Sequence, residues 1–144
     1  MSAIRTILLA EDSPADAEMA IDALRDANLA NPIVHVEDGV EALDYLLQRG
    51  AHAGREDGLP AVLLLDIKMP RMDGLEVLKH IRSHDKLKKL PVVILSSSRE
   101  ESDLARSWGV NAYVVKPVDV DQFFRAVKLL GTFWAVINEA PVED

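Results

Sequence analysis

Short apolar runs and amphipathic segments alternate along the chain. The apolar runs are four to six residues long, which is too short for a helix and typical of buried strands. The run Val62–Leu65 lacks the polar alternation of a half-exposed strand, so it predicts a strand covered on both faces, as in a parallel sheet. The predicted strands are Arg5–Ala10, Ile33–Val36, Val62–Leu65, Pro91–Leu95 and Ala112–Val115.

A helix-starting signal follows each apolar run. Ser13 and Pro14 predict an N-cap and a first helical residue, for a helix that runs to about Asn28 with Met19, Ala23 and Ala27 on one face. Four later segments carry Asp or Ser three residues before Glu or Gln, which is the pattern of a capping box: Asp38 with Glu41, Asp73 with Glu76, Ser98 with Glu101, and Asp119 with Gln122. The helix after Ser98 has a weak apolar face that includes Trp108, so we expect it to be able to move.

The alternation of five strands with five helices predicts the fold class. It favours an α/β, doubly wound domain with a parallel sheet and helices on both faces. Residues 50–60 contain three glycines and predict an inserted loop rather than a domain boundary. A length of 144 residues fits one domain spanning 1–144, with a helical extension at about 131–140.

Composition narrows the class of protein. Hydrophobic residues make up 49% and charged residues 28% of the chain, which is a globular balance. The absence of Cys excludes a disulfide scaffold or a thiolate nucleophile, and neither a signal peptide nor a membrane span is evident, so we expect a cytoplasmic protein. A net charge of -8 disfavours binding to nucleic acid or to an anionic membrane surface.

Polar residues follow four of the predicted strands directly. They are Glu11 with Asp12, Asp66, Ser96 and Lys116. Because the carboxyl ends of parallel strands meet at one edge of a sheet, we expect these side chains to share a crevice. Three carboxylates in one place repel one another unless a cation is present, and oxygen-only ligands suit Mg²⁺.

The charges of this predicted site suit a phosphoryl group. Three carboxylates, one lysine and Mg²⁺ leave the site near neutral, so that an anion can enter. Asp66 is the natural nucleophile, and it would form an acyl phosphate whose oxygens contact Mg²⁺, Ser96 and Lys116. No strong general base is evident, which suits a slow reaction with a persistent product.

At this point the chain resembles the receiver domain of two-component response regulators over nearly its whole length. The segment from Asp66 to Gly74 is similar to the family's signature. The resemblance implies a flavodoxin-like strand order 2-1-3-4-5 and a phosphoacceptor that receives its phosphoryl group from a histidine kinase. It also implies a role for each matching residue: Glu11 and Asp12 as metal ligands, Asp66 as phosphoacceptor, Lys68 as a metal ligand through its carbonyl, Ser96 and Tyr113 as the switch pair, and Lys116, before a cis Pro117, as the phosphate-binding lysine.

A narrower resemblance concerns the stand-alone regulators of bacterial and cyanobacterial phytochromes. It rests on the inserted loop before the third strand and on the aromatic tail ending in Phe133 and Trp134. It implies a phytochrome kinase as the phosphodonor and a signal that leaves by protein contact, because no output domain is expected. Two alternatives remain: a phosphorelay intermediate, and an Mg²⁺-dependent aspartyl-phosphate phosphatase. The second is disfavoured because Lys68 stands where such enzymes place a second Asp.

The last predicted helix has an apolar stripe longer than one domain needs. Its members are spaced by four, three, four and three residues: Phe123, Val127, Leu130, Trp134 and Ile137. An unpartnered apolar stripe favours self-association, so we expect a homodimer through this helix and its tail, besides an unknown downstream protein.

Overall fold

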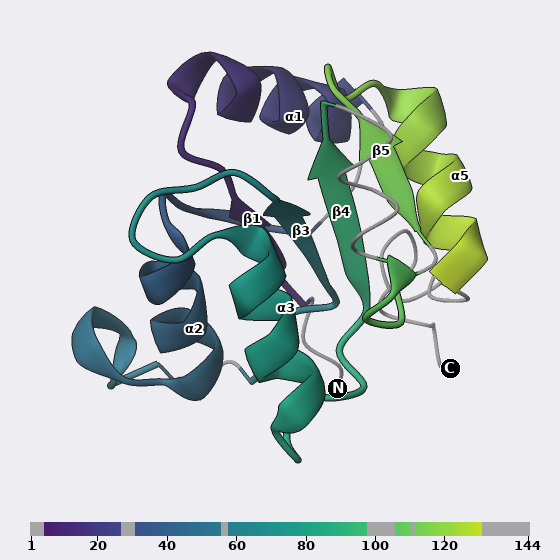
Figure 1. Ribbon diagram of the computed structural model, residues 1–144. Helices are drawn as coiled ribbons and strands as arrows, with labels where there is room; N and C mark the ends of the chain where they lie inside the picture. Colours follow the sequence, from purple (N-terminus) through teal and green to yellow (C-terminus); the bar gives the residue numbers. More distant parts are fainter. Residues whose placement is uncertain (1–4, 27–30, 56–57, 98–105, 111, 131–144) are drawn as a thin grey trace, which may run out of the picture.

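The computed structural model describes residues 5–26, 31–55, 58–97, 106–110 and 112–130. Five strands form one parallel sheet in the order β2-β1-β3-β4-β5, which confirms the predicted topology (Figure 1). The strands are β1 (Ile7–Ala10), β2 (Ile33–Val36), β3 (Val62–Asp66), β4 (Val92–Ser96) and β5 (Tyr113–Val115).

The helices cover both faces of this sheet. They are α1 (Pro14–Asp26), α2 (Gly39–Leu47), a short 3-10 helix η1 (Gly50–His52), α3 (Gly74–Ser83) and α5 (Val120–Leu130). Helices α1 and α5 pack on one face and α2 and α3 on the other (Figure 1). Most of the predicted fourth helix falls in residues 98–105, outside the described residues, and so does the predicted extension at about 131–140.

The core consists of two apolar layers, one on each face of the sheet. Successive strand residues point to opposite faces, so Leu63 and Leu65 contact the α2 and α3 layer while Val62 and Leu64 contact the α1 and α5 layer. All five residues of β3 are buried. The unbroken apolar run therefore has the physical cause inferred from the sequence, namely cover on both faces.

The buried face of α1 differs from the predicted one. Met19 is 46% exposed, whereas Ala17, Ala20 and Leu24 are buried. These three residues, spaced by three and four, lie on one side of the helix, and Met19 lies two residues from Ala17 and thus nearly opposite it. Small alanines let the helix backbone approach the sheet, so the prediction for Met19 was wrong. Trp108 is also exposed, at 40%, and the Lys79 ammonium lies 5.3 Å from the centre of its ring.

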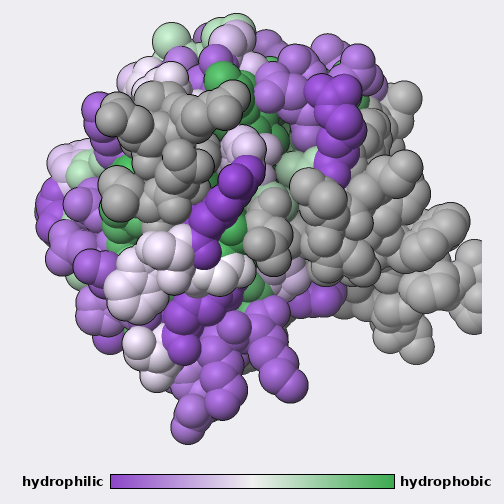
Figure 2. Space-filling model, turned by 45° about the vertical axis from the view of Figure 1, so that its right-hand side comes forward, coloured by the Kyte–Doolittle hydropathy of each residue, from purple (hydrophilic) through white to green (hydrophobic). Residues whose placement is uncertain are grey.

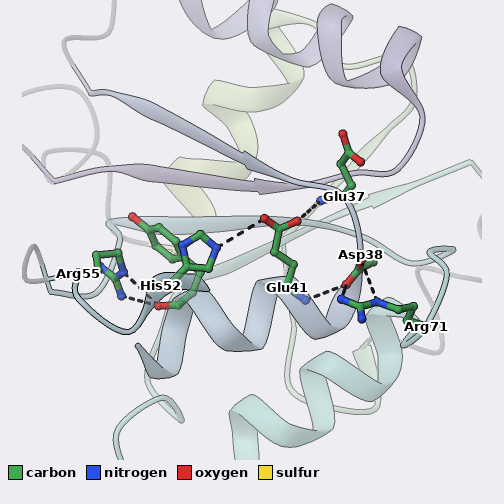
Figure 3. A network of polar contacts seen from close by, with 7 residues as sticks. Glu37, Asp38, Glu41, His52, Arg55 and Arg71 are labelled. Atoms are coloured by element: carbon green, nitrogen blue, oxygen red, sulfur yellow. Dashed lines mark hydrogen bonds and ion pairs between the residues drawn. The ribbon is translucent and has the colours of Figure 1, made fainter. Parts of the chain in front are cut away.

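The predicted helix caps are confirmed where the structure describes them. Asp38, Asp73 and Asp119 each accept a hydrogen bond from the backbone N–H three residues later, at 2.8, 2.9 and 2.8 Å. At α2 the second hydrogen bond of the capping box differs from the expected one. The Glu41 carboxylate accepts from the N–H of Glu37 and not from that of Asp38 (Figure 3). The predicted cap at Ser98 lies outside the described residues.

Arg55 helps to hold the inserted segment 50–60 against the end of α2. The Arg55 guanidinium lies 3.9 Å from the centre of the Tyr45 ring and donates to the Tyr45 carbonyl at 2.6 Å. That carbonyl is one of the last in α2, where a cation is favourable. The described part of the insertion is therefore packed against the domain.

Phe123 corrects part of the predicted dimer surface. It is 1% exposed and packs in the layer of α1 and α5. A side chain that the core already buries contributes nothing to a contact between subunits. The side chains of Val127 and Leu130, and residues Trp134 and Ile137 as a whole, lie outside the described residues.

The face of the molecule seen in Figure 2 is mainly polar where it is coloured. Figure 2 shows hydrophilic side chains over much of the coloured area, with apolar areas in small patches between them. No helix in the described part of the chain has the length and apolar character needed to cross a membrane.

Candidate functional site

The register of the sheet brings Glu11 and Asp66 together. Ala10 lies opposite Leu65 in the parallel pair β1 and β3, so Glu11, just after β1, and Asp66, the last residue of β3, lie side by side. Glu11 is 1% exposed and Asp66 4% exposed, whereas Asp12 is open to solvent. One carboxylate oxygen from each of these three residues lies within 4.8 Å of the other two. The predicted acidic cluster is therefore present.

Strands β4 and β5 bring the other two predicted residues to the same edge. Leu95 lies opposite Asp66, so Ser96 follows one residue later on the neighbouring strand. The backbone N–H of Lys116 donates to the Ser96 carbonyl at 2.9 Å, which holds the two residues next to each other. Ser96 is fully buried, and the peptide bond between Lys116 and Pro117 is cis, as expected.

The Lys116 ammonium contacts two members of the acidic cluster, Glu11 and Asp66, and one further acid, Asp16. Its Nζ is 2.8 Å from Glu11 Oε1, 3.1 Å from Asp66 Oδ1 and 3.1 Å from Asp16 Oδ2. Burial alone would lower the pKa of Lys116, but the hydrogen bond to Glu11, the charge of Asp66 and the hydrogen bond to Asp16 outweigh it. Together they raise the pKa of Lys116 above its ordinary value, so the ammonium stays charged.

The environment of Asp66 works against its ionisation. Burial and the negative charge of Glu11 raise the pKa of Asp66 to about 7, although Lys116 acts in the opposite direction. Two buried carboxylates share one ammonium here, so their charges are only partly compensated. The site therefore has capacity for further positive charge.

Asp16 is a member of this site that the sequence analysis missed. It lies in the first turn of α1, where an acidic residue is ordinarily explained by the helix dipole. Asp12 precedes the helix, which begins at Pro14, so no helical spacing links Asp16 to the acids that follow β1. The contact with Lys116, 100 residues away, could not be inferred from local pattern.

The loop from β3 to α3 is shaped by a glycine and a left-handed residue. A Cβ atom on Gly74 would overlap the backbone of Asp66 and Ile67, and the Gly74 N–H donates to the Ile67 carbonyl at 2.7 Å. Arg71 has a φ of 64°, and its guanidinium donates to both carboxylate oxygens of Asp38, each at 3.1 Å (Figure 3). The loop that follows Asp66 is thereby fastened to the start of α2.

The two predicted switch residues lie on neighbouring strands. Ser96 ends β4, and Tyr113 begins β5 with its ring partly buried against the α2 and α3 layer. The Arg106 guanidinium lies 4.8 Å from the centre of the Tyr113 ring and donates to its hydroxyl. Their switch role stays a prediction, as does that of the Lys68 carbonyl; the Lys68 side chain is exposed.

The acidic cluster fits a hard divalent cation. Its donors are all oxygens, two of its carboxylates are buried, and the third, Asp12, is exposed on the solvent side. Hard cations such as Mg²⁺ and Mn²⁺ favour carboxylate, carbonyl and water ligands. A cation here would also offset the charge repulsion between Glu11 and Asp66.

Comparison with known proteins agrees with this geometry. The family model described as the response regulator receiver domain matches residues 7–128. The chain belongs to the response regulator receiver domain family. Members of this family are signalling domains of two-component systems, and phosphoryl acceptance is their general feature.

Solved receiver structures refine the comparison. The bacteriophytochrome response regulator AtBRR is 53% identical with a TM-score of 0.90, and the match covers 95% of this chain and 99% of that one. The bacteriophytochrome response regulator RtBRR is 51% identical with a TM-score of 0.88, covering 96% and 85% of the two chains. The chain is thus a receiver similar to phytochrome response regulators.

A third relative bears on the metal. Response regulator Rcp1 from Synechocystis sp. is 33% identical over 132 residues, covering 90% of this chain and 88% of Rcp1. A crystal structure of Rcp1 in its Mn²⁺-bound form has a TM-score of 0.73 at 30% identity, and that match covers 97% of this chain and 99% of the other. Receivers bind a divalent metal, and the acidic cluster described above is of the kind that would hold one.

Proposed function

We propose that this protein is a phytochrome-type response regulator in which Asp66 accepts a phosphoryl group from a histidine kinase, with Mg²⁺ as the metal. One observation carries most weight. The buried Asp66 carboxylate lies 3.1 Å from the Lys116 ammonium and within the cluster formed with Glu11 and Asp12. A nucleophilic carboxylate next to a fixed cation, at the carboxyl edge of a parallel sheet, suits phosphoryl transfer.

In the proposed reaction, an Asp66 carboxylate oxygen attacks the donor phosphorus. The new oxygen–phosphorus bond forms while the bond from phosphorus to the donor nitrogen breaks, and the donor imidazole keeps the electron pair and takes up a proton from solvent. The Lys116 ammonium and the Ser96 hydroxyl would contact the oxygens of the transferred group. The product is an acyl phosphate on Asp66.

The metal would be held by the chain's own oxygens. Glu11, Asp12 and Asp66 supply carboxylates, and the Lys68 carbonyl is the further ligand predicted from the sequence. When bound, Mg²⁺ would supply positive charge that stabilises the phosphoryl oxygens during transfer. Lys116 would then share its hydrogen bonds between the carboxylates and the phosphoryl group.

The residues fit a phosphorylation switch better than a phosphatase that hydrolyses its substrate repeatedly. The position two residues after Asp66 is Lys68, where an aspartyl-phosphate phosphatase would need an acid. We propose that phosphorylation draws Ser96 and Tyr113 inward and thereby shifts the population between conformations of the face made by the predicted fourth helix, β5 and α5. A phosphorelay intermediate would use the same residues and differ only in its partners.

The proposed partners follow from the same reasoning. Similarity to AtBRR and RtBRR supports a bacteriophytochrome as the histidine kinase. A homodimer through the end of α5 remains a proposal that rests on the apolar spacing of Val127, Leu130, Trp134 and Ile137, without Phe123. Sedimentation showing only monomers at tens of micromolar, with and without phosphorylation, would contradict it.

Intact-mass spectrometry tests the phosphoacceptor. We expect acetyl phosphate with Mg²⁺ to add the mass of one phosphoryl group to the wild-type protein and to Asp85→Asn, whose side chain is 98% exposed just after the end of α3. Asp66→Asn should gain nothing, and chelation of Mg²⁺ should suppress the gain in wild type. A gain that survives Asp66→Asn would overturn the assignment. Repeated release of phosphate from a monoester would favour the phosphatase.

A further inference from the structure

Asp16 is the outermost contact of the Lys116 ammonium. The three carboxylate oxygens at Nζ belong to Glu11, Asp66 and Asp16, at 2.8 to 3.1 Å. The side chains of Glu11 and Asp66 are 1% and 6% exposed, whereas that of Asp16 is 39% exposed. The ammonium is thus bound to two buried acids on its inner side and to one hydrated acid on its outer side.

The Lys116 ammonium donates a hydrogen bond to Asp16 Oδ2 and forms ion pairs with Glu11 and Asp66, so carboxylates surround it. An ammonium has three N–H donors and no acceptor, and three carboxylates are present to receive them. A phosphoryl oxygen on Asp66 could be bound only if one of these contacts is released or shared. Water can replace the lysine at the exposed Asp16 carboxylate, while release of either buried acid would leave a buried charge unpaired. The Asp16 contact is therefore the one that breaks at least cost.

Asp16 also changes the charge of the site. With Asp16 included, four carboxylates, one ammonium and one divalent cation sum to about -1, and without Asp16 they sum to about zero. Because Asp16 and Asp66 contact the same nitrogen at 3.1 Å each, their oxygens are at most about 6 Å apart. An anionic phosphodonor that approaches Asp66 must therefore approach Asp16 as well.

We propose that Asp16 is a positioning residue that acts through Lys116: it holds the ammonium in the unphosphorylated protein and slows the entry of anionic phosphodonors. This inference rests on the proposed function of Asp66. When the phosphoryl group arrives at Asp66, the Asp16 carboxylate releases the Lys116 ammonium. The freed N–H of Lys116 then binds a phosphoryl oxygen. Asp16 would thereby help to set how readily the receiver is phosphorylated without its kinase.

The test compares two variants that remove one negative charge each from α1. Asp16→Asn removes the carboxylate that contacts Lys116, and Glu18→Gln removes an exposed carboxylate two residues further along the same helix. Phosphorylation rates would be followed by intact mass with Mg²⁺, using acetyl phosphate as a dianionic donor and phosphoramidate as a monoanionic donor, at low and high salt.

We expect Asp16→Asn to speed phosphorylation by acetyl phosphate about three- to tenfold at low salt, because of the lost repulsion and the freed N–H. The gain should be smaller with phosphoramidate and smaller at high salt, a pattern that a merely structural role would not produce. Glu18→Gln and the conservative Asp16→Glu should stay near the wild-type rate.

Two results would overturn the inference. One is a rate for Asp16→Asn that is unchanged, reduced or equal to that of Glu18→Gln. The other is a gain that is the same for both donors and at both salt concentrations. Failure of the proposed function would look different, because the wild-type protein would then take up no phosphoryl group, or Asp66→Asn would still take one up.

Discussion

The raised pKa of Asp66 predicts how the stability of the metal-free protein depends on pH. Burial and the charge of Glu11 raise that pKa to about 7, whereas the carboxyl of an unfolded Asp has its ordinary value of 3.8. The folded protein therefore binds this proton more readily than the unfolded chain. The stability that results is fully present below the unfolded pKa and is lost as the pH rises through about 7.

The size of this effect follows from linkage. With those two pKa values, the free energy of unfolding should fall by about 2 kcal/mol between pH about 5.5 and about 8 in the presence of a chelator. For a domain of this length that corresponds to a drop of about 4 to 8 °C in the melting temperature. Lys116 adds no slope in this window, because its raised pKa lies far above it.

Urea unfolding followed by circular dichroism at several pH values measures this slope. Asp66→Asn should lose it, because the amide is neutral at every pH, and the variant should be more stable than wild type at about pH 8 by about 4 kcal/mol, the full penalty that the two pKa values imply. Asp85→Asn, at a side chain that is 98% exposed, should keep the wild-type slope. Saturating Mg²⁺ should reduce the slope, since the metal favours the ionised carboxylate. Parallel pH profiles for wild type and Asp66→Asn in chelator would refute the reasoning.

Two further predictions concern the scaffold of the site. Gly74→Ala should lower the free energy of unfolding by about 1 to 3 kcal/mol in urea titration, because its Cβ would overlap the backbone of Asp66, whereas Gly54→Ala has open space and should change little. Asp38→Ala removes both the cap of α2 and the partner of Arg71, and should cost about 1 kcal/mol. Arg71→Ala should cost less, because the cap survives; an equal loss in both variants would show that the ion pair, not the cap, stabilises this end of α2.

Much of the fold was predictable from local sequence. The five apolar runs became strands, and the Asp caps at Asp38, Asp73 and Asp119 accept the expected hydrogen bonds. These features depend on interactions between residues a few positions apart, which a chain encodes directly. The meeting of Glu11 with Asp66 was also predictable, because parallel strands end at one edge of the sheet.

Other features depended on contacts between distant segments. Phe123 has the same helical spacing as an interface residue would have, and only packing against the α1 layer identifies it as core. Likewise, Met19 and Ala20 are both apolar, and the small alanine faces the sheet because it permits the closer approach.

The sequence by itself determined which acids end the strands, and hence the nucleophile, the metal type and the phosphoryl chemistry to be expected. Only the tertiary structure decided how their charges are shared. In the sequence, Asp16 is an acidic residue in the first turn of a helix, a position that needs no tertiary contact to explain it. The folded structure places its carboxylate 3.1 Å from the Lys116 ammonium. An ion pair between residues 100 positions apart gives no periodic signal in the sequence, because it depends on how two distant elements pack in the folded domain.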